Sequence, residues 1–81
     1  MNKTELIKTQ IAEGASIFEF EYNGLDGNVD YYYIQETKSI EILLWFNGEE
    51  ITVYDIDSAM NTKFINGKSL AEVADDIKIT S

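Results

Sequence analysis

The amino-acid sequence predicts a single α+β domain over residues 1–81, with an N-terminal helix, a four-stranded antiparallel meander and two short C-terminal helices. Three observations predict this fold. The chain has 81 residues, 44% of them hydrophobic, which suits one small folded domain. The middle of the chain alternates apolar and polar residues between Asp-Gly and Asn-Gly pairs, as hairpins do. Both ends show helical spacing of apolar residues after a capping residue.

The first expected element is a helix over residues 2–13. Asn2, followed three residues later by Glu5, is a capping-box-like start, and Gly14 suits the position just past the helix end. Packing of this helix on a sheet requires an apolar stripe along one side. The stripe is formed by Leu6, Ile7 and Ile11.

The middle of the chain is expected to form four strands joined by three turns. The first turn is placed at Asp26-Gly27, which would set Tyr22 opposite Tyr31. A four-residue loop around Thr37-Lys38 and a two-residue turn at Asn47-Gly48 would complete the sheet. The further pairs that follow are Phe20–Tyr33, Tyr33–Ile42, Tyr31–Leu44, Leu44–Ile51 and Ile42–Val53.

All three turns agree on which side chains share the first face of the sheet. A slip of one residue in any strand would move that strand's apolar side chains to the other face, so the agreement supports the four-stranded arrangement. This core face is expected to collect Phe18, Phe20, Tyr22, Val29, Tyr31, Tyr33, Ile40, Ile42, Leu44, Phe46, Ile51 and Val53.

The second face of the sheet is unusual because it is also apolar. Trp45 and Leu43, with Tyr32 and Ile34 on the neighbouring strand and Tyr54 beyond, are expected to form an apolar strip in which Tyr32 lies opposite Leu43. An apolar centre inside a charged rim is typical of an interaction site, and Trp and Tyr are enriched at binding hot spots. The four expected strands carry no lysine. The acidic rim is expected to contain Glu19, Glu21, Asp30, Glu36, Glu41 and Glu50.

Three arrangements would account for this second face. The first helix could lie over it and bury the apolar strip within the molecule. The face could instead pair with a second copy of the chain, or it could dock another protein. Antiparallel sheets often leave one side in water, but such a side is expected to be rich in Thr and Lys, and this one is rich in acids.

Two short helices are expected after the sheet. Asp55 can cap the first, and Ser69 with Glu72 forms a capping box for the second, after a turn at Asn66-Gly67. The apolar residues of the second helix recur at helical spacing, which predicts that one side of it packs on the core. These residues are Leu70, Val73, Ala74 and Ile77.

Asp75 and Asp76 would lie in the last turn of that helix, where the helix dipole disfavours each by ~0.3–1 kcal/mol. Three interpretations are open. The two carboxylates are solvated, or they bind a partner, or the helix ends early and IKIT at residues 77–80 forms a short terminal strand.

The charge and composition limit the class of protein. The net charge is −9, from six lysines against 15 acids, which repels nucleic-acid backbones and anionic membranes and favours basic partners. No apolar run approaches the ~20 residues of a membrane-spanning helix, and MNKTELIK lacks the apolar core of a signal peptide. We therefore expect a cytoplasmic protein. The lack of Arg and Pro is typical of an AT-rich bacterial or phage genome.

No motif predicts catalysis, a metal or a cofactor. The chain has no His or Cys, which nucleophile triads and common metal sites need. NGKS at residues 66–69 ends like a phosphate-binding loop, but Thr62 stands where Gly is required. A calcium-loop start at residues 26–30 is followed by Tyr31 instead of Gly. Acid pairs such as Glu49-Glu50 point to opposite faces of a strand. We therefore expect a protein that is not an enzyme.

The segment FINGKSLAEVADDIKI at residues 64–79 resembles a pattern in small uncharacterised acidic proteins of low-GC Gram-positive bacteria and their mobile elements. In that pattern an F-x-x-G-K-S-L run opens a final helix that ends in acids. The resemblance implies no activity, and no functional residue is carried over from it.

The sequence favours a small acidic module of unknown process that docks a basic protein partner through the second face. Trp45 and Leu43 would anchor the partner, and the acids would speed encounter. An alternative is a nucleic-acid mimic that inhibits a nucleic-acid-binding protein, which small acidic phage proteins resemble in size and charge. A further alternative is a homodimeric structural protein. The predicted partner-binding residues are Trp45, Leu43, Tyr32, Ile34, Glu19, Glu21, Asp30 and Glu41.

Overall fold

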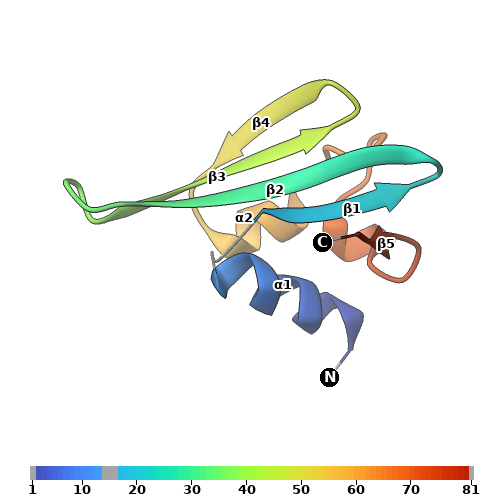
Figure 1. Ribbon diagram of the computed structural model, residues 1–81, viewed down its shortest axis with the longest axis horizontal. Coiled ribbons are helices and arrows are strands. Elements are labelled where there is room, and N and C mark those ends of the chain that lie inside the picture. Colours follow the sequence, from blue (N-terminus) through green and yellow to red (C-terminus); the bar gives the residue numbers. More distant parts are fainter. Residues whose placement is uncertain (1, 14–16, 81) are drawn as a thin grey trace.

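A five-stranded antiparallel sheet with helices on one side forms a single compact α+β domain (Figure 1). The computed structural model describes residues 2–13 and 17–80. The strand order is β4-β3-β2-β1-β5, so the sheet has one more strand than expected. The elements are α1 (Lys3–Glu13), β1 (Phe18–Tyr22), β2 (Leu25–Ile34), β3 (Ser39–Phe46), β4 (Glu49–Val53), α2 (Ile56–Asn61), α3 (Leu70–Val73) and β5 (Lys78–Ile79).

The fifth strand exists because the last helix ends early. Helix α3 stops at Val73, and residues 74–76 form a turn that carries both aspartates into solvent. The chain then reaches the free edge of β1, where Ile79 pairs with Phe20 and Lys78 with Glu21. Of the three interpretations of Asp75 and Asp76, the short terminal strand is confirmed.

The first hairpin turns at Asn23-Gly24 and not at Asp26-Gly27, so that expectation was wrong. Both turn residues have positive φ, 52° and 78°, which is the conformation that Asn-Gly adopts most readily in a two-residue turn. Phe20 therefore pairs with Gly27 and not with Tyr33. The difference shifts the pairing by an even number of residues, so every side chain keeps its expected face.

The pairing of the first hairpin is shifted by six residues and that of the second by two, whereas the third is as expected. A four-residue loop at residues 35–38 sets Tyr33 opposite Ile40 and not opposite Ile42. At Asn47-Gly48 both residues have positive φ, 49° and 92°. This turn sets Leu44 opposite Ile51, which confirms the expected register of the third hairpin.

The three caps that the sequence predicts are present. The Glu5 amide donates to the Asn2 side chain at 2.9 Å, and the Ser58 amide donates to the Asp55 carboxylate at 2.7 Å. At Ser69 both hydrogen bonds of the capping box are formed. Gly14, the expected end of the first helix, lies outside the described residues.

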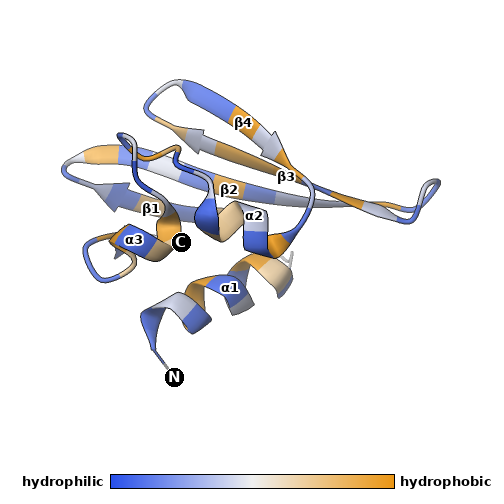
Figure 2. Cartoon of the chain, turned by 180° about the vertical axis from the view of Figure 1, so that it is seen from behind, coloured by the Kyte–Doolittle hydropathy of each residue, from blue (hydrophilic) through white to orange (hydrophobic). Residues whose placement is uncertain are grey.

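Helices α1, α2 and α3 all lie on the same side of the sheet (Figures 1 and 2). Ile7 and Ile11 of α1 join the core on that side, and Leu6 of the expected stripe is exposed. The first helix therefore does not cover the Trp45 face, which removes one of the three arrangements considered for it. Most of the expected core face is buried, but Tyr31 and Ile40 are half-buried, and Tyr33 and Ile51 at its margins are 54% and 40% exposed.

Candidate partner-binding face

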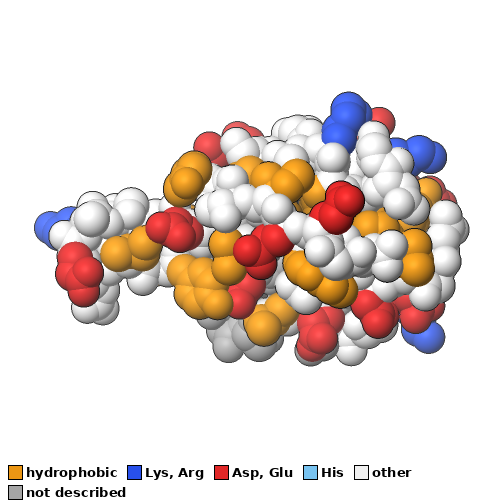
Figure 3. All heavy atoms as spheres, turned by 90° about the horizontal axis from the view of Figure 1, so that it is seen from above, with side chains coloured by type: hydrophobic (Ala, Val, Ile, Leu, Met, Phe, Trp, Pro, Cys, Tyr) orange, Lys and Arg blue, Asp and Glu red, His pale blue; other side chains and the backbone are white. Residues whose placement is uncertain are grey.

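The side of the sheet away from the helices is called the open face here, and Figure 3 looks onto it. Hydrophobic and acidic side chains are interleaved over it. Strand alternation places on this face the side chains that point away from the core. From β1 to β4 they are Glu19, Glu21, Asp26, Asn28, Asp30, Tyr32, Ile34, Ser39, Glu41, Leu43, Trp45, Glu50 and Thr52.

The strand register decides how acids and apolar groups neighbour one another. Trp45 lies between Glu50 on β4 and Asn28 on β2. Leu43 lies opposite Asp30, and not opposite Tyr32 as expected. The acids therefore lie among the apolar side chains as well as around them, which differs from the apolar centre and acidic rim that the sequence predicts.

The four apolar residues of the predicted site differ in exposure. Tyr32 is 48% exposed. Trp45, Leu43 and Ile34 are half-buried by their neighbours on the sheet, and none of the described helices lies above them. Among the predicted acids, Glu19 is exposed. The three half-buried acids are Glu21, Asp30 and Glu41. A partner can therefore reach all eight predicted residues, most readily through Tyr32 and Glu19.

A hydrogen bond brings Tyr32 back toward the centre of the open face. Its hydroxyl donates to Asp30 Oδ2 at 2.6 Å, along the strand and toward the pair that Asp30 forms with Leu43. The bond to Asp30 and the negative charge of Asp30, with a smaller effect of Glu50, raise the pKa of Tyr32 above its ordinary value. Tyr32 therefore stays a neutral donor in a negative field.

Three of the six lysines, Lys3, Lys8 and Lys63, make contacts away from the open face, which leaves the centre of that face negative. Lys8 pairs with Asp57 at 3.7 Å on the helical side, and Lys3 donates to the Ile77 carbonyl at 2.6 Å. Strands β1 to β4 carry no lysine, as expected, but the added strand β5 brings one lysine to the open face. It is Lys78, which lies opposite Glu21 on the added strand β5, at the edge of the sheet.

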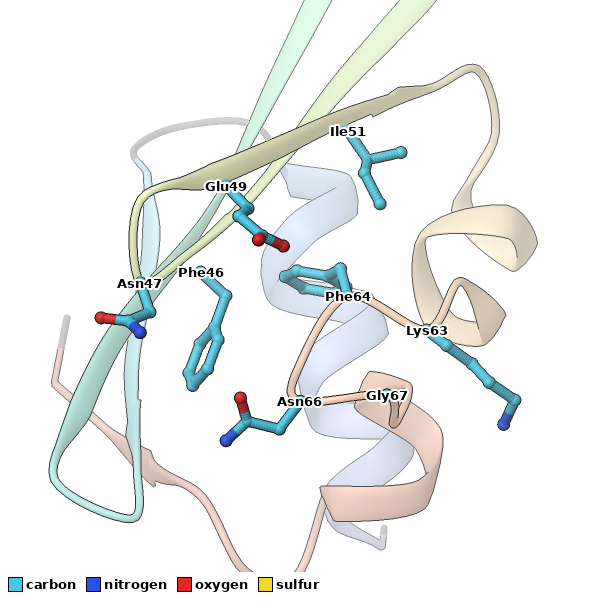
Figure 4. Close-up of a pocket in the computed structure, with 8 residues that line it drawn as sticks. All are labelled: Phe46, Asn47, Glu49, Ile51, Lys63, Phe64, Asn66 and Gly67. Carbon is cyan, nitrogen blue, oxygen red and sulfur yellow. The ribbon is translucent and has the colours of Figure 1, made fainter.

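A cavity of about 160 Å³ lies between two turns that are far apart in sequence (Figure 4). Phe46, Glu49 and Ile51 line it from the third hairpin, and Phe64 and Asn66 line it from the segment that leads to α3. The sequence patterns do not predict this cavity. The only signal was the recurrence of Asn-Gly at 47–48 and 66–67, which marks two tight turns but not their proximity.

The segment NGKS at residues 66–69, which resembles the end of a phosphate-binding loop, has a structural role. Asn66 and Gly67 have positive φ and join Ile65 to Lys68 by a pair of backbone hydrogen bonds of 2.9 Å, so NGKS is a tight turn and a helix cap. Within residues 2–13 and 17–80, no group of three or more acidic side chains is arranged to hold a metal ion. None of the described helices is long and apolar enough to cross a membrane.

The comparisons with known proteins identify no relative. The chain matches no protein-family model, no curated protein and no solved structure at a significant level.

Proposed function

We propose that this chain is a small non-enzymatic module that docks a basic protein partner through the open face. The observation that carries the proposal is a half-buried tryptophan on the inner strand β3 of a sheet face that none of the described helices covers. Trp45 and Leu43 would anchor the partner, because large apolar groups at the centre of an interface contribute most of the binding energy. Tyr32 and Ile34 would extend the apolar contact.

A basic partner is favoured by the way the acids are interleaved with the aromatic rings. An Arg or Lys side chain can lay its apolar stem and its cation over Trp45 or Tyr32 and still reach a carboxylate. Asp30 and Glu41 flank Tyr32, and Glu50 lies opposite Trp45. The net charge of −9 adds long-range attraction for such a partner and repels acidic competitors.

A nucleic-acid mimic is the second candidate, and the spacing of the acids favours it. Glu19 and Glu21 follow one another on the same face of β1, and residues two apart on a strand are separated by roughly 6.5–7 Å. A Lys- or Arg-lined nucleic-acid groove could accept such a row. Contacts of this kind weaken steeply with salt, whereas an interface anchored by Trp45 and Leu43 would largely persist.

The experiment is an affinity capture from lysate of the source cell, with wild-type protein beside Trp45→Ala/Leu43→Ser. Leu6→Ser is the matched control, because Leu6 is an exposed apolar residue on the helical side. The proposal predicts a basic protein that is captured by wild type and by Leu6→Ser in low and high salt but is lost in the double variant. A partner captured equally by all three proteins contradicts the proposal.

Two other outcomes would favour the alternatives. A nucleic-acid-binding protein that is released between low and high salt, whatever residue stands at position 45, would favour the mimic. A dimer in sedimentation at micromolar concentration that Trp45→Ala dissociates would favour the homodimer.

A further inference from the structure

Strand β4 ends the sheet on one side and offers an unpaired backbone edge. Its only neighbour among the described strands is β3. The two-residue turn at Asn47-Gly48 makes Phe46 and Glu49 a hydrogen-bonded pair, and such pairs alternate along an antiparallel ladder. The N–H and C=O groups of Glu50 and Thr52 therefore point away from β3. No described backbone group outside the β3–β4 ladder bonds to them.

This edge lacks most of the devices that block a strand from adding to a sheet. Exposed edges are commonly protected by lysine, proline or a bulge. Strand β4 contains none of these residues, and its pairing with β3 runs without interruption from Glu49 to Val53. Residues 49–52 are all exposed, and Ile51 presents 40% of its surface. The only charged residues of this strand are Glu49 and Glu50, which protect the edge less than lysine would.

The cavity described above opens beside this edge. In Figure 4 the Glu49 carboxylate and the Ile51 side chain point toward Phe64 from β4, and the Lys63 side chain points away from the cavity. The Lys63 ammonium is held by the Glu72 carboxylate at 2.5 Å. The cavity thus combines three apolar side chains, those of Phe46, Ile51 and Phe64, with polar ones, and the Glu49 carboxylate at its mouth forms no ion pair with a described lysine.

We propose that the β4 edge is a strand-addition site for an extended, basic segment of a partner protein. The segment would pair with the free N–H and C=O groups of Glu50 and Thr52. Its side chain opposite Ile51 would be apolar and enter the cavity against Phe64, because alternate side chains of an added strand fall on the same side of the sheet. Lys or Arg side chains would lie beside Glu49 and Glu50.

Charge decides between a basic segment and a second copy of this chain. Two copies joined at β4 would bring together two molecules of net charge −9 with the acids of both edges close by. A basic segment is attracted by the same acids that repel the second copy. The proposal does not depend on the open face, because the pairing groups are backbone atoms at the edge.

The test uses a random peptide library displayed on phage, selected on wild-type protein and counter-selected on Thr52→Pro. Proline at position 52 removes an outward-pointing N–H and is tolerated on edge strands, whereas Thr52→Ala keeps the N–H and is the matched control. We expect enriched peptides in which Lys or Arg alternates with an apolar residue. Titration of a synthetic enriched peptide should move the amide resonances of Glu50 and Thr52 most.

Peptide binding should weaken by about tenfold or more in Thr52→Pro, as expected for a lost hydrogen bond and a proline ring in its place, and should change little in Thr52→Ala. Glu49→Gln/Glu50→Gln leaves the backbone intact and should weaken binding more at low salt than at high salt. The proposal is overturned if no peptide distinguishes wild type from Thr52→Pro, or if the resonance shifts centre on Trp45. A dimer of the free protein that Thr52→Pro dissociates would also overturn it, because the edge would then hold a second copy.

Discussion

Replacing Gly27 by Ala should destabilise the protein, although Ala is normally the better residue in a strand. A Cβ built on Gly27 would lie 2.7 Å and 2.9 Å from two ring carbons of Phe20 and closer still to a third, where ordinary contacts are 3.4–4 Å. Phe20 is 1% exposed and packs against Phe46 and Phe64, so its ring has no free space to enter. The clash arises from the pairing of Phe20 with Gly27 that the Asn23-Gly24 turn imposes.

The expected magnitude is about 2 kcal/mol. Overpacking a core costs roughly 1–3 kcal/mol, and three close ring atoms place this site near the upper end. Ala recovers about 0.5–1 kcal/mol because Gly loses more backbone entropy on folding. For a domain of this size, a net loss of about 2 kcal/mol corresponds to a fall in Tm of roughly 8–16 °C.

Urea unfolding of a double-mutant cycle is the assay. Gly27→Ala should cost about 2 kcal/mol in the wild-type background and less than about 0.5 kcal/mol with Phe20→Leu, because leucine lacks the ring atoms that clash. The reasoning is refuted if Gly27→Ala stabilises the wild-type protein. It is also refuted if the cost is the same in both backgrounds, because the loss would then not come from the Phe20 ring.

Three further predictions follow from the structure. Phe46→Ala should cost about 3–5 kcal/mol in urea unfolding because Phe46 is buried, whereas Trp45→Ala should cost less than about 1.5 kcal/mol because no helix covers it. Asp30→Asn should lower the pKa of Tyr32 toward 10.0, seen by NMR titration of its ring carbon, because it removes the carboxylate that the hydroxyl bonds. Hydrogen bonds from the Lys63 ammonium and the Ser69 amide lower the pKa of Glu72 from 4.5 to about 2, so its stabilising contribution is complete above pH 4.5 and lost as pH falls toward 2. In Glu72→Gln, the free energy of unfolding measured in urea should therefore depend less on pH between about 2 and 4.5 than in the wild-type protein.

The faces of the strands could be predicted from the sequence more readily than their pairing. Apolar alternation assigns Phe18 and Phe20 to one face whichever turn is chosen, provided that the turn shifts the register by an even number. Asp26-Gly27 and Asn23-Gly24 both meet that condition, so periodicity does not distinguish them. The stronger preference of Asn for positive φ favours the second.

The membership of the open face was therefore predictable, but its internal arrangement was not. All eight predicted partner-binding residues point to the side of the sheet away from the helices. Their neighbours depend on register, and a shift of two residues moved Asp30 between the apolar side chains. The cavity could not be predicted, because it forms where residues 46–51 meet residues 63–67 and no local pattern specifies that contact.

The end of the last helix shows how a local conflict can indicate structure. Helical spacing continues to Ile77, yet Asp75 and Asp76 oppose the dipole of a helix that would include them. The observed chain resolves the conflict by ending α3 at Val73 and burying Ile77 before β5. Residues 78 and 79 instead pair with the edge of β1 and form hydrogen bonds there. Helical propensity, which is a local property, does not predict this pairing.

Fluorescence of the single tryptophan tests most directly the claim that the centre of the open face is accessible and negative. Quenching of Trp45 by caesium and by iodide is measured at equal ionic strength and normalised to N-acetyltryptophanamide. Relative to N-acetyltryptophanamide, Trp45 should be quenched by caesium almost as strongly and by iodide much more weakly. The reason is that the carboxylates around the indole attract the cation and repel the anion. Equal and strong protection from both ions would mean that the indole is covered, and preferential quenching by iodide would mean that the face is not negative.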